Sequence, residues 1–186
     1  GERRARAGDQ APYDWGRAVG RYPFERIFQM AEIASMLAPE ALPELKKATS
    51  DPDSAVRYWG VLGILMRGKK AVIEAETELK NALRDSSPEV RIAAAEAVAQ
   101  FGTETDFRAM VALLFEQADS RKHGVFSAMA SLNSLYALHA KLGPFANQLA
   151  PLPMDPLVPH ARYSPYVKRL ILDLEEKLSP ARTQRK

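Results

Sequence analysis

The sequence predicts an all-α fold, a right-handed α–α superhelix of about three to four stacked helix pairs. The main evidence is a repeat, because residues 51–57 and Gly68 have counterparts at 85–91 and Gly102, each 34 positions further on. A period of this size is typical of solenoids in which every repeat is a pair of helices. A second observation agrees: apolar residues recur at helical spacing along most of the chain.

The paired helices are predicted from their start and stop signals. After a first helix that begins at Phe24 and ends before Pro39, two pairs are expected, at 40–49 with 54–67 and at 71–84 with 88–101. Asp53 and Ser87 precede the second helix of each pair as N-caps. Gly68 and Gly102 follow it as C-terminal caps.

The C-terminal part of the chain departs from the strict repeat. A third unit is expected, with helices at 106–116 and 124–141 and a cap at Gly143, which lies 41 positions after Gly102. Terminal units of a stack are commonly atypical, and the prolines that follow predict an irregular connection. The expected organisation is a flexible N-terminal lead-in (1–22), a helical-repeat domain (23–143), a Pro-rich connection (144–164), a C-terminal helix (165–178) and a basic tail (179–186).

Composition and charge narrow the function classes. The 186 residues include no cysteine, which excludes disulfides and thiolate metal sites but indicates no compartment. The net charge of +3 comes from the ends: residues 1–8 contribute +2 and residues 181–186 contribute +3, so the body between them carries −2. Nucleic acid is therefore not an expected partner, because phosphate binding needs cations on one folded face. No apolar run of about 18 residues occurs, so no membrane span is expected.

Four charged residues recur with the repeat. Asp51 and Asp85 lie in the turns between paired helices, and Arg57 and Arg91 lie just inside the helices that follow. Two interpretations are open: the arginines bind an anion, or they form a structural ladder with the aspartates between consecutive repeats. We favour the ladder, because the two carboxylates recur in step with the two arginines.

The helix at 54–67 is apolar on nearly every side. Gly60 and Gly63 stand on the stripe expected to face other helices, where small residues allow a close approach. Outside that stripe the helix carries a candidate interaction surface of Tyr58, Trp59, Leu62 and Met66. A helix of this kind is buried all round. Either the first helix and a strap at 13–16 cover this surface, or it docks another domain or subunit.

No pattern typical of a reaction centre or a cofactor site is present. His123, His139 and His160 lack a second ligand at helical spacing, so no metal site is expected. Neither Gly-x-Ser-x-Gly nor a Gly-rich phosphate loop occurs. The alternating glutamates at 74–78 indicate a solvated helix face. We therefore expect no catalytic, cofactor-binding or metal-binding residue.

The pattern Asp-x-x-x-Glu-Val-Arg-x-x-Ala-x-x-Ala at 85–97, with a looser copy at 51–63, resembles HEAT repeats. The resemblance covers residues 40–102 well and residues 24–143 loosely. It implies an armadillo-type solenoid that serves as a scaffold or as a binding surface for another protein.

A narrower resemblance rests on the order of three segments, Tyr-Asp-Trp-Gly at 13–16, Arg-Tyr-Pro-Phe-Glu-Arg-Ile at 21–27 and the repeat motif at 51–60. This order is similar to the region that follows the catalytic domain in certain bacterial sulfatases of the alkaline-phosphatase-like superfamily. The reaction of that family needs a Cys/Ser-x-Pro-x-Arg motif and a calcium site. Here Val90 stands where the motif needs arginine, so no catalytic residue carries over. The resemblance implies an appendage of a periplasmic or extracellular hydrolase.

The sequence thus predicts a non-catalytic helical-repeat scaffold or protein-interaction domain from the C-terminal part of a sulfatase-like hydrolase. Whether the parent chain is a sulfuric ester hydrolase is left open. One alternative is an independent HEAT-like adaptor that binds a protein or peptide on its inner helices. Another is a repeat enzyme that acts on bilin–protein linkages.

Overall fold

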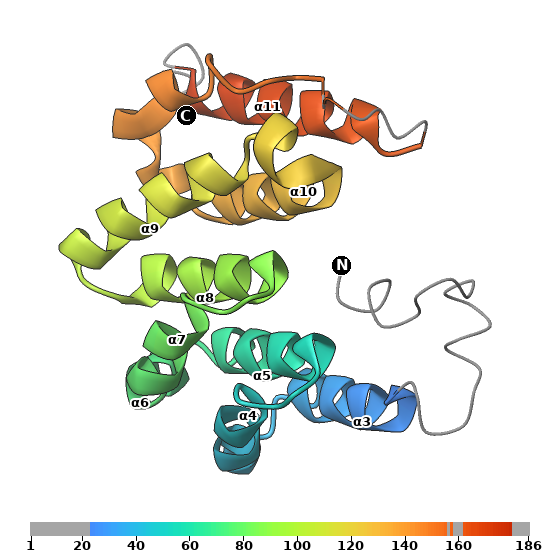
Figure 1. Ribbon diagram of the computed structural model, residues 1–186. Coiled ribbons are helices and arrows are strands. Elements are labelled where there is room, and N and C mark those ends of the chain that lie inside the picture. Colours follow the sequence, from blue (N-terminus) through green and yellow to red (C-terminus); the bar gives the residue numbers. More distant parts are fainter. Residues whose placement is uncertain (1–22, 156, 158–161, 180–186) are drawn as a thin grey trace.

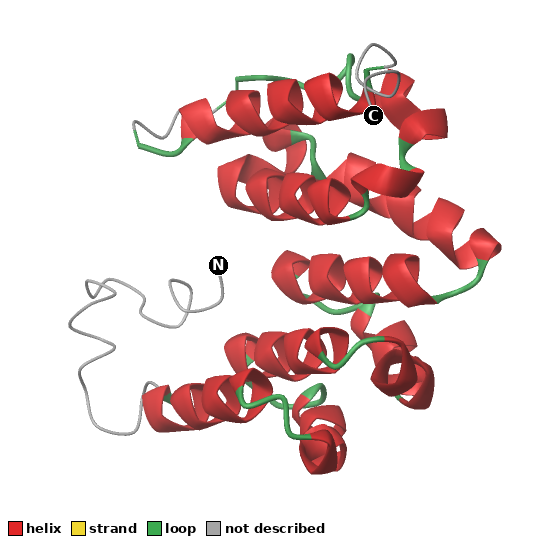
Figure 2. Cartoon of the chain, turned by 180° about the vertical axis from the view of Figure 1, so that it is seen from behind, coloured by secondary structure: helices red, strands yellow, loops and turns green. Residues whose placement is uncertain are grey.

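The computed structural model describes residues 23–155, 157 and 162–179, and every secondary-structure element in this part of the chain is a helix (Figures 1 and 2). The all-α prediction is therefore confirmed. The α-helices are α3 (Phe24–Ser35), α4 (Leu42–Ala48), α5 (Ser54–Met66), α6 (Lys69–Glu74), α7 (Glu76–Ala82), α8 (Pro88–Phe101), α9 (Glu104–Gln117), α10 (Ser120–Ala137) and α11 (Ser164–Leu178). Short 3₁₀ helices are η1 (Pro39–Ala41), η2 (His139–Lys141) and η3 (Gly143–Gln148).

The helices form two rows. One row, called here the inner row, runs α3, α5, α8, α10 and α11, and each member packs against the next (Figure 1). The other row holds α4, the α6–α7 pair and α9, which pack against α5, α8 and α10 respectively. The described residues therefore form three helix pairs, with α3 as an extra helix at one end and α11 at the other. The right-handed superhelical path stays a prediction.

The hydrophobic core consists of two clusters that meet at α8. The first is built from α3 to α8 and includes Val90 and Ala94 of α8. The second is built from α8 to α11 and includes Ile92 and Ala95 of the same helix. Helix α8 is alanine-rich and buried on both sides, because it has an inner-row neighbour above and below it. Its two faces therefore link the halves of the molecule.

Some helices differ from the sequence-based expectation in their bounds. Helix α3 ends before Pro39 as expected, at Ser35, and Leu37 beyond it adopts a left-handed backbone conformation with a φ of 56°. Helix α10 spans Ser120–Ala137, whereas the sequence predicted a helix at 124–141. The expected helix at 71–84 is broken into α6 and α7 at Ala75, whose φ of −102° and ψ of 23° are not helical. Ala75 is fully buried, so the break lies in the core.

The glycine caps were only partly predicted. Gly68 has a φ of 75° after α5, as a C-terminal cap requires. Gly102 is extended, with a φ of −79°, and its missing Cβ instead makes room for the Val98 carbonyl oxygen, which would lie 2.5 Å away. Gly143 opens η3 and ends no helix. The left-handed glycine of the third unit is Gly124, with a φ of 80°, which kinks α10.

The small residues of α5 do allow a close approach. A Cβ at position 60 would lie 2.9 Å from the backbone oxygen of Leu45 in α4. A Cβ at position 63 would lie 2.6 Å from a methyl carbon of Leu45 and 3.0 Å from the Cβ of Ala34 in α3. Helices α3 and α4 thus both contact α5 at its glycines.

The expected C-terminal helix is present as α11, with Val167, Ile171 and Leu174 buried against the second cluster. The Pro-rich connection contains the 3₁₀ helix η3, so it is less irregular than the prolines suggested. The predicted lead-in, the strap at 13–16 and all but the first residue of the basic tail lie outside the described residues. None of the described helices is long and apolar enough to cross a membrane.

Candidate functional site

The two repeated turns fold in the same way. The Oδ1 atom of Asp51 accepts a hydrogen bond from the backbone N–H of Asp53 at 2.8 Å, and the Oδ1 atom of Asp85 accepts one from Ser87 at 2.8 Å. An aspartate that bonds the backbone two residues on closes a turn by itself. Each repeated aspartate therefore sets the direction in which the next inner-row helix begins.

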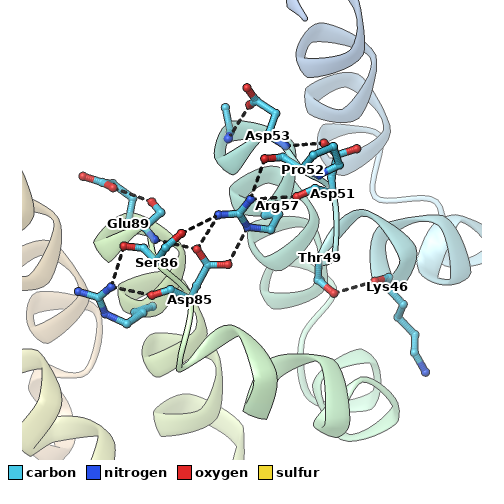
Figure 3. A network of polar contacts seen from close by, with 12 residues as sticks. Lys46, Thr49, Asp51, Pro52, Asp53, Arg57, Asp85, Ser86 and Glu89 are labelled. Atoms are coloured by element: carbon cyan, nitrogen blue, oxygen red, sulfur yellow. Dashed lines mark hydrogen bonds and ion pairs between the residues drawn. The ribbon is translucent and has the colours of Figure 1, made fainter. Parts of the chain in front are cut away.

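Arg57 joins two consecutive repeats (Figure 3). Its Nε donates to the Oδ2 of Asp85 at 2.7 Å, and its Nη2 donates to the Oδ1 at 2.8 Å. Its Nη1 donates to the backbone oxygens of Asp51 and Pro52 at 2.9 and 3.2 Å. The Arg57 and Asp85 side chains are only 12% and 10% exposed. Such a two-pronged, largely buried pair is among the stronger polar contacts in proteins.

Arg91 differs from the predicted ladder, because within the described part of the chain its hydrogen bonds go to no carboxylate. Its Nη1 donates to the backbone oxygens of Asp85 and Ser86 at 2.7 and 3.1 Å, as Arg57 does one repeat earlier. Its Nη2 lies 3.5 Å from the Oε1 of Gln117. The aspartate one period after Asp85 is Asp119, which instead accepts from backbone N–H groups at the start of α10. The degenerate third unit thus ends the series of ion pairs.

The series continues in the other direction. Arg26 of α3 donates a hydrogen bond to the carboxylate of Asp51 in the first repeated turn. Arg57 of α5 makes the equivalent contact with Asp85 in the second repeated turn. The side chain of Arg26 is 51% exposed, so this outer pair is far less protected from water than the Arg57–Asp85 pair. The repeat-to-repeat partners are therefore Arg26 with Asp51 and Arg57 with Asp85.

The electrostatics of the Asp85 turn favour the ionised carboxylate. Burial raises the pKa of Asp85, but the hydrogen bond from Arg57, the backbone N–H of Ser87 and the charges of Arg57 and Arg91 outweigh burial and bring the pKa below its ordinary value. Both arginines of the repeat thus act on this one carboxylate, although only Arg57 bonds to it.

The candidate interaction surface on α5 does not form one exposed patch. Tyr58, Trp59 and Leu62 are half-buried and pack against the first core cluster. The rings of Tyr58 and Trp59 meet edge to face at 5.9 Å. Met66 is 43% exposed and lines a hollow of about 640 Å³ together with Leu37. Helix α3 packs against α5, and the alternative that it covers this surface stays a prediction.

Glu96 of α8 is a polar residue that the sequence analysis did not single out. Burial raises the pKa of Tyr58, and the carboxylates of Glu96 and Glu89 on α8 raise it further. Glu96 accepts hydrogen bonds from Gln100 of α8 at 3.0 Å and from Ser134 of α10 at 2.7 Å. Glu96 therefore joins two inner-row helices, α8 and α10, by a hydrogen bond. Its counterpart one repeat earlier is Leu62, so the repeat gave no signal for it.

Arg67 is a second residue that the sequence analysis missed. Its guanidinium donates hydrogen bonds to four backbone oxygens. The distances are 2.9 Å to Ile33, 3.2 Å to Ala34, 3.0 Å to Ala38 and 2.8 Å to Gly63. A cation at the carbonyl end of a helix satisfies unpaired carbonyl groups and opposes the helix dipole. Arg67 therefore caps α3 from α5. Its counterpart is Phe101, so this cap belongs to one unit only.

The described residues include no group of three His, Asp or Glu side chains that could hold a metal ion. His123 pairs with Glu116, and His139 bonds the backbone oxygen of Tyr136. His160 lies outside the described residues.

Comparison with known proteins identifies one repeat. The family model of the HEAT repeat matches residues 77–104, which hold most of α7, all of α8 and the first residue of α9. No curated protein and no solved structure matches the chain. The match covers one repeat, and together with the helical pairs it supports a HEAT-like helical repeat domain.

Proposed function

We propose that the chain is a non-catalytic scaffold that holds another protein domain or subunit against its helices. The supporting observation is that α7 and α8 match the HEAT repeat, a unit that buries its own core against neighbours and leaves an extended surface for partners. The polar side chains of Asp85, Arg67 and Glu96 form hydrogen bonds between helices. Such contacts hold a helical scaffold together and support a structural role.

The finer part of the proposal is that the scaffold belongs to the C-terminal part of a sulfatase-like hydrolase. It rests on the order of segments at 13–16, 21–27 and 51–60. In that arrangement the scaffold packs against the catalytic domain of the same polypeptide. Any ester hydrolysis is then carried out by that domain of the parent chain.

The deciding experiment starts with the coding sequence upstream of Gly1. An alkaline-phosphatase-like domain with a Cys/Ser-x-Pro-x-Arg motif there supports the proposal, and a start codon at that point contradicts the sulfatase part of it. If the domain is present, co-expression of the two parts and measurement of their association by calorimetry tests the scaffold role. Failure of the two parts to associate would contradict an interdomain role.

A second candidate is an independent adaptor that binds a peptide on the inner row. It is favoured by the half-buried Tyr58, Trp59 and Leu62 on that row. The same upstream sequence separates the two, because an adaptor needs no hydrolase domain before it.

A further inference from the structure

The first two described helices, α3 and α4, enclose a groove at their end of the stack, and Figure 1 shows where these helices lie. We call it the end groove. It has a volume of about 770 Å³, and its walls include Arg26, Gln29 and Met30 of α3, Glu44 of α4 and the turn at Asp51. The row of α4, α6–α7 and α9, called here the outer row, packs against α5, α8 and α10 in turn. Among the described residues, α3 has no outer-row helix of its own.

The end groove is the repeat counterpart of the place in which α4 lies. Arg26 of α3 corresponds to Arg57 of α5, 31 positions later, because each binds the aspartate of the repeated turn that follows. In this alignment Gln29 corresponds to Gly60, where an added Cβ would lie 2.9 Å from the backbone oxygen of Leu45 in α4. The wall that α3 contributes thus matches the wall of α5 against which α4 packs. Because Gln29 is larger than glycine, an occupant would lie farther from α3, and the Gln29 amide can donate a hydrogen bond to it.

The charge on the α4 wall of the groove also has a counterpart. Glu78 of α7 lies 3.5 Å from the Nζ atom of Lys46 in α4. Its counterpart 34 positions earlier is Glu44, which is exposed and forms no ion pair with another described residue. A helix in the end groove with a lysine at the place of Lys46 would supply the missing charge. Complementary charge of this kind selects a partner more than it adds affinity.

Arg26 has hydrogen-bond donors that its counterpart uses. Besides its bonds to Asp85, Arg57 donates through Nη1 to the backbone oxygens of Asp51 and Pro52, in the turn that follows α4. Arg26 donates to the Asp51 carboxylate, and no backbone oxygen of the described residues accepts from it. Its side chain is correspondingly 51% exposed, against 12% for Arg57. The turn after an outer-row helix would bring carbonyl groups to these free donors.

We propose that the end groove binds an amphipathic helix of another protein domain, which continues the outer row by one helix. The occupant has two apolar residues three positions apart, as Leu45 and Ala48 are in α4, and a lysine directly after the first of them. The turn at its C-terminal end presents backbone oxygens to Arg26. Binding of a helix in a groove is typically determined by apolar residues at such spacing. This inference rests on the proposed scaffold function, for which it supplies the binding surface.

The segment that precedes α3 does not have this pattern. The residues 34 positions before Leu45 and Ala48 are Ala11 and Asp14, and those 31 positions before them are Asp14 and Arg17. In either alignment an aspartate stands at one of the two apolar places. Burial of a carboxylate without a partner is costly. The pattern therefore favours an occupant from another domain.

The probe for the test is a peptide with the sequence of residues 40–53, which contains α4 and the turn after it. The complete 186-residue chain is isotope-labelled and titrated with this peptide, and the backbone amide shifts are followed by NMR. An isolated helix of this length is marginal in water, so we expect weak, saturable binding. The shift changes should lie at residues 26–30 and 44–51, with none on α10 or α11. The tether keeps the chain's own α4 in place, because its effective concentration is high.

A charge swap tests the orientation of the occupant. Glu44→Lys in the protein should weaken binding several-fold, and a peptide with Lys46→Glu should recover binding to that variant. Arg26→Gln should also weaken binding several-fold. The matched control is Glu104→Lys on α9, an exposed glutamate that does not line the end groove; it should leave binding unchanged. Circular dichroism verifies that each variant keeps its helices.

Four results would overturn the proposal. The first is no binding to the complete chain at millimolar peptide, and the second is a set of shift changes centred outside the groove. The third is a charge swap without recovery, which would show that Glu44 does not face the occupant. The fourth is a change of the groove signals with protein concentration in the absence of peptide, which would assign the groove to a second copy of the chain. A scaffold that still associates with its catalytic domain would then lose only this inference.

Discussion

At the scale of single residues, the Arg57–Asp85 pair is a largely buried ion pair between consecutive repeats. Removing one partner of a buried ion pair leaves the other charge without compensation, which costs more than the pair itself contributes. Arg57 has the Asp85 carboxylate as a partner, whereas the hydrogen bonds of Arg91 go to backbone oxygens and toward Gln117. The two arginines recur in sequence but are not equivalent in energy.

We therefore expect Arg57→Ala to lower the free energy of unfolding by about 3 kcal/mol, the range for a buried pair that loses one partner. A double-mutant cycle of Arg57→Ala with Asp85→Ala should show a coupling of about 0.5 kcal/mol or more. Urea denaturation measures both. The matched cycle of Arg91→Ala with Asp51→Ala should be additive, because these two side chains share no hydrogen bond. Coupling in the second cycle and none in the first would contradict this assignment.

The same pair predicts a dependence of stability on pH. The pKa of Asp85 is lower in the folded protein than its ordinary value, so the unfolded chain binds the proton more tightly than the folded protein does. The ionised carboxylate therefore stabilises the fold at pH values above its ordinary pKa of about 3.9. This contribution is lost as the pH falls through the lowered pKa. The stability difference between the wild type and Asp85→Asn should therefore be full near pH 7 and shrink in acid. Urea denaturation at several pH values checks it; a difference constant across the range argues against the assignment.

At the scale of helices, the two glycines of α5 determine how closely α3 and α4 approach. Alanine is a better helix former than glycine by about 1 kcal/mol, so local preference alone would favour alanine at both positions. At position 60, however, the new Cβ would meet backbone atoms of α4, and backbone cannot move aside as a side-chain end can. Packing and propensity therefore oppose each other here.

We expect packing to prevail, so that Gly60→Ala destabilises the protein despite its better helix propensity, since overpacking costs about 1–3 kcal/mol. Thermal and urea denaturation measure the change. Gly143→Ala is the control, because a Cβ added at position 143 would have no neighbour within 4 Å among the described residues, and the φ of Gly143 is not positive; it should be close to neutral. A Gly60→Ala protein that is more stable than the wild type would show that α4 can retreat from α5.

At the scale of the whole molecule, α8 makes one cooperative unit out of two cores. Its buried residues divide between the first and the second cluster. Repeat proteins gain stability from nearest-neighbour interfaces, so loss of either half exposes one face of α8. Neither cluster is therefore expected to survive the unfolding of the other.

This predicts a helical far-ultraviolet spectrum and a single unfolding transition. In a Trp15→Phe variant Trp59 is the one remaining tryptophan, and it reports on the first cluster while circular dichroism reports on all helices. The two midpoints should coincide in urea. Separate midpoints would indicate that the halves unfold independently, and substantial strand content would contradict the fold.

The sequence by itself determined the helical repeat, because its signals are local. The repeated aspartates close their turns with backbone groups two residues away, and the apolar spacing of α5 and α8 follows from one helical period. Interactions within a few residues are the same whatever the rest of the chain does. The period of 34 could therefore be recognised without knowing any contact between helices.

Only the tertiary structure decided which groups meet between helices. Arg57 bonds a carboxylate 28 positions away, Arg67 caps a helix up to 34 positions away, and Ser134 reaches Glu96 across 38 positions. The repeat implied the same kind of partner, an aspartate, for Arg57 and for Arg91. The turn of the third unit differs, however, and Arg91 lies beside Gln117. Which side chains pair depends on the helix that happens to pack beside each one, and that arrangement arises from burial of the whole core.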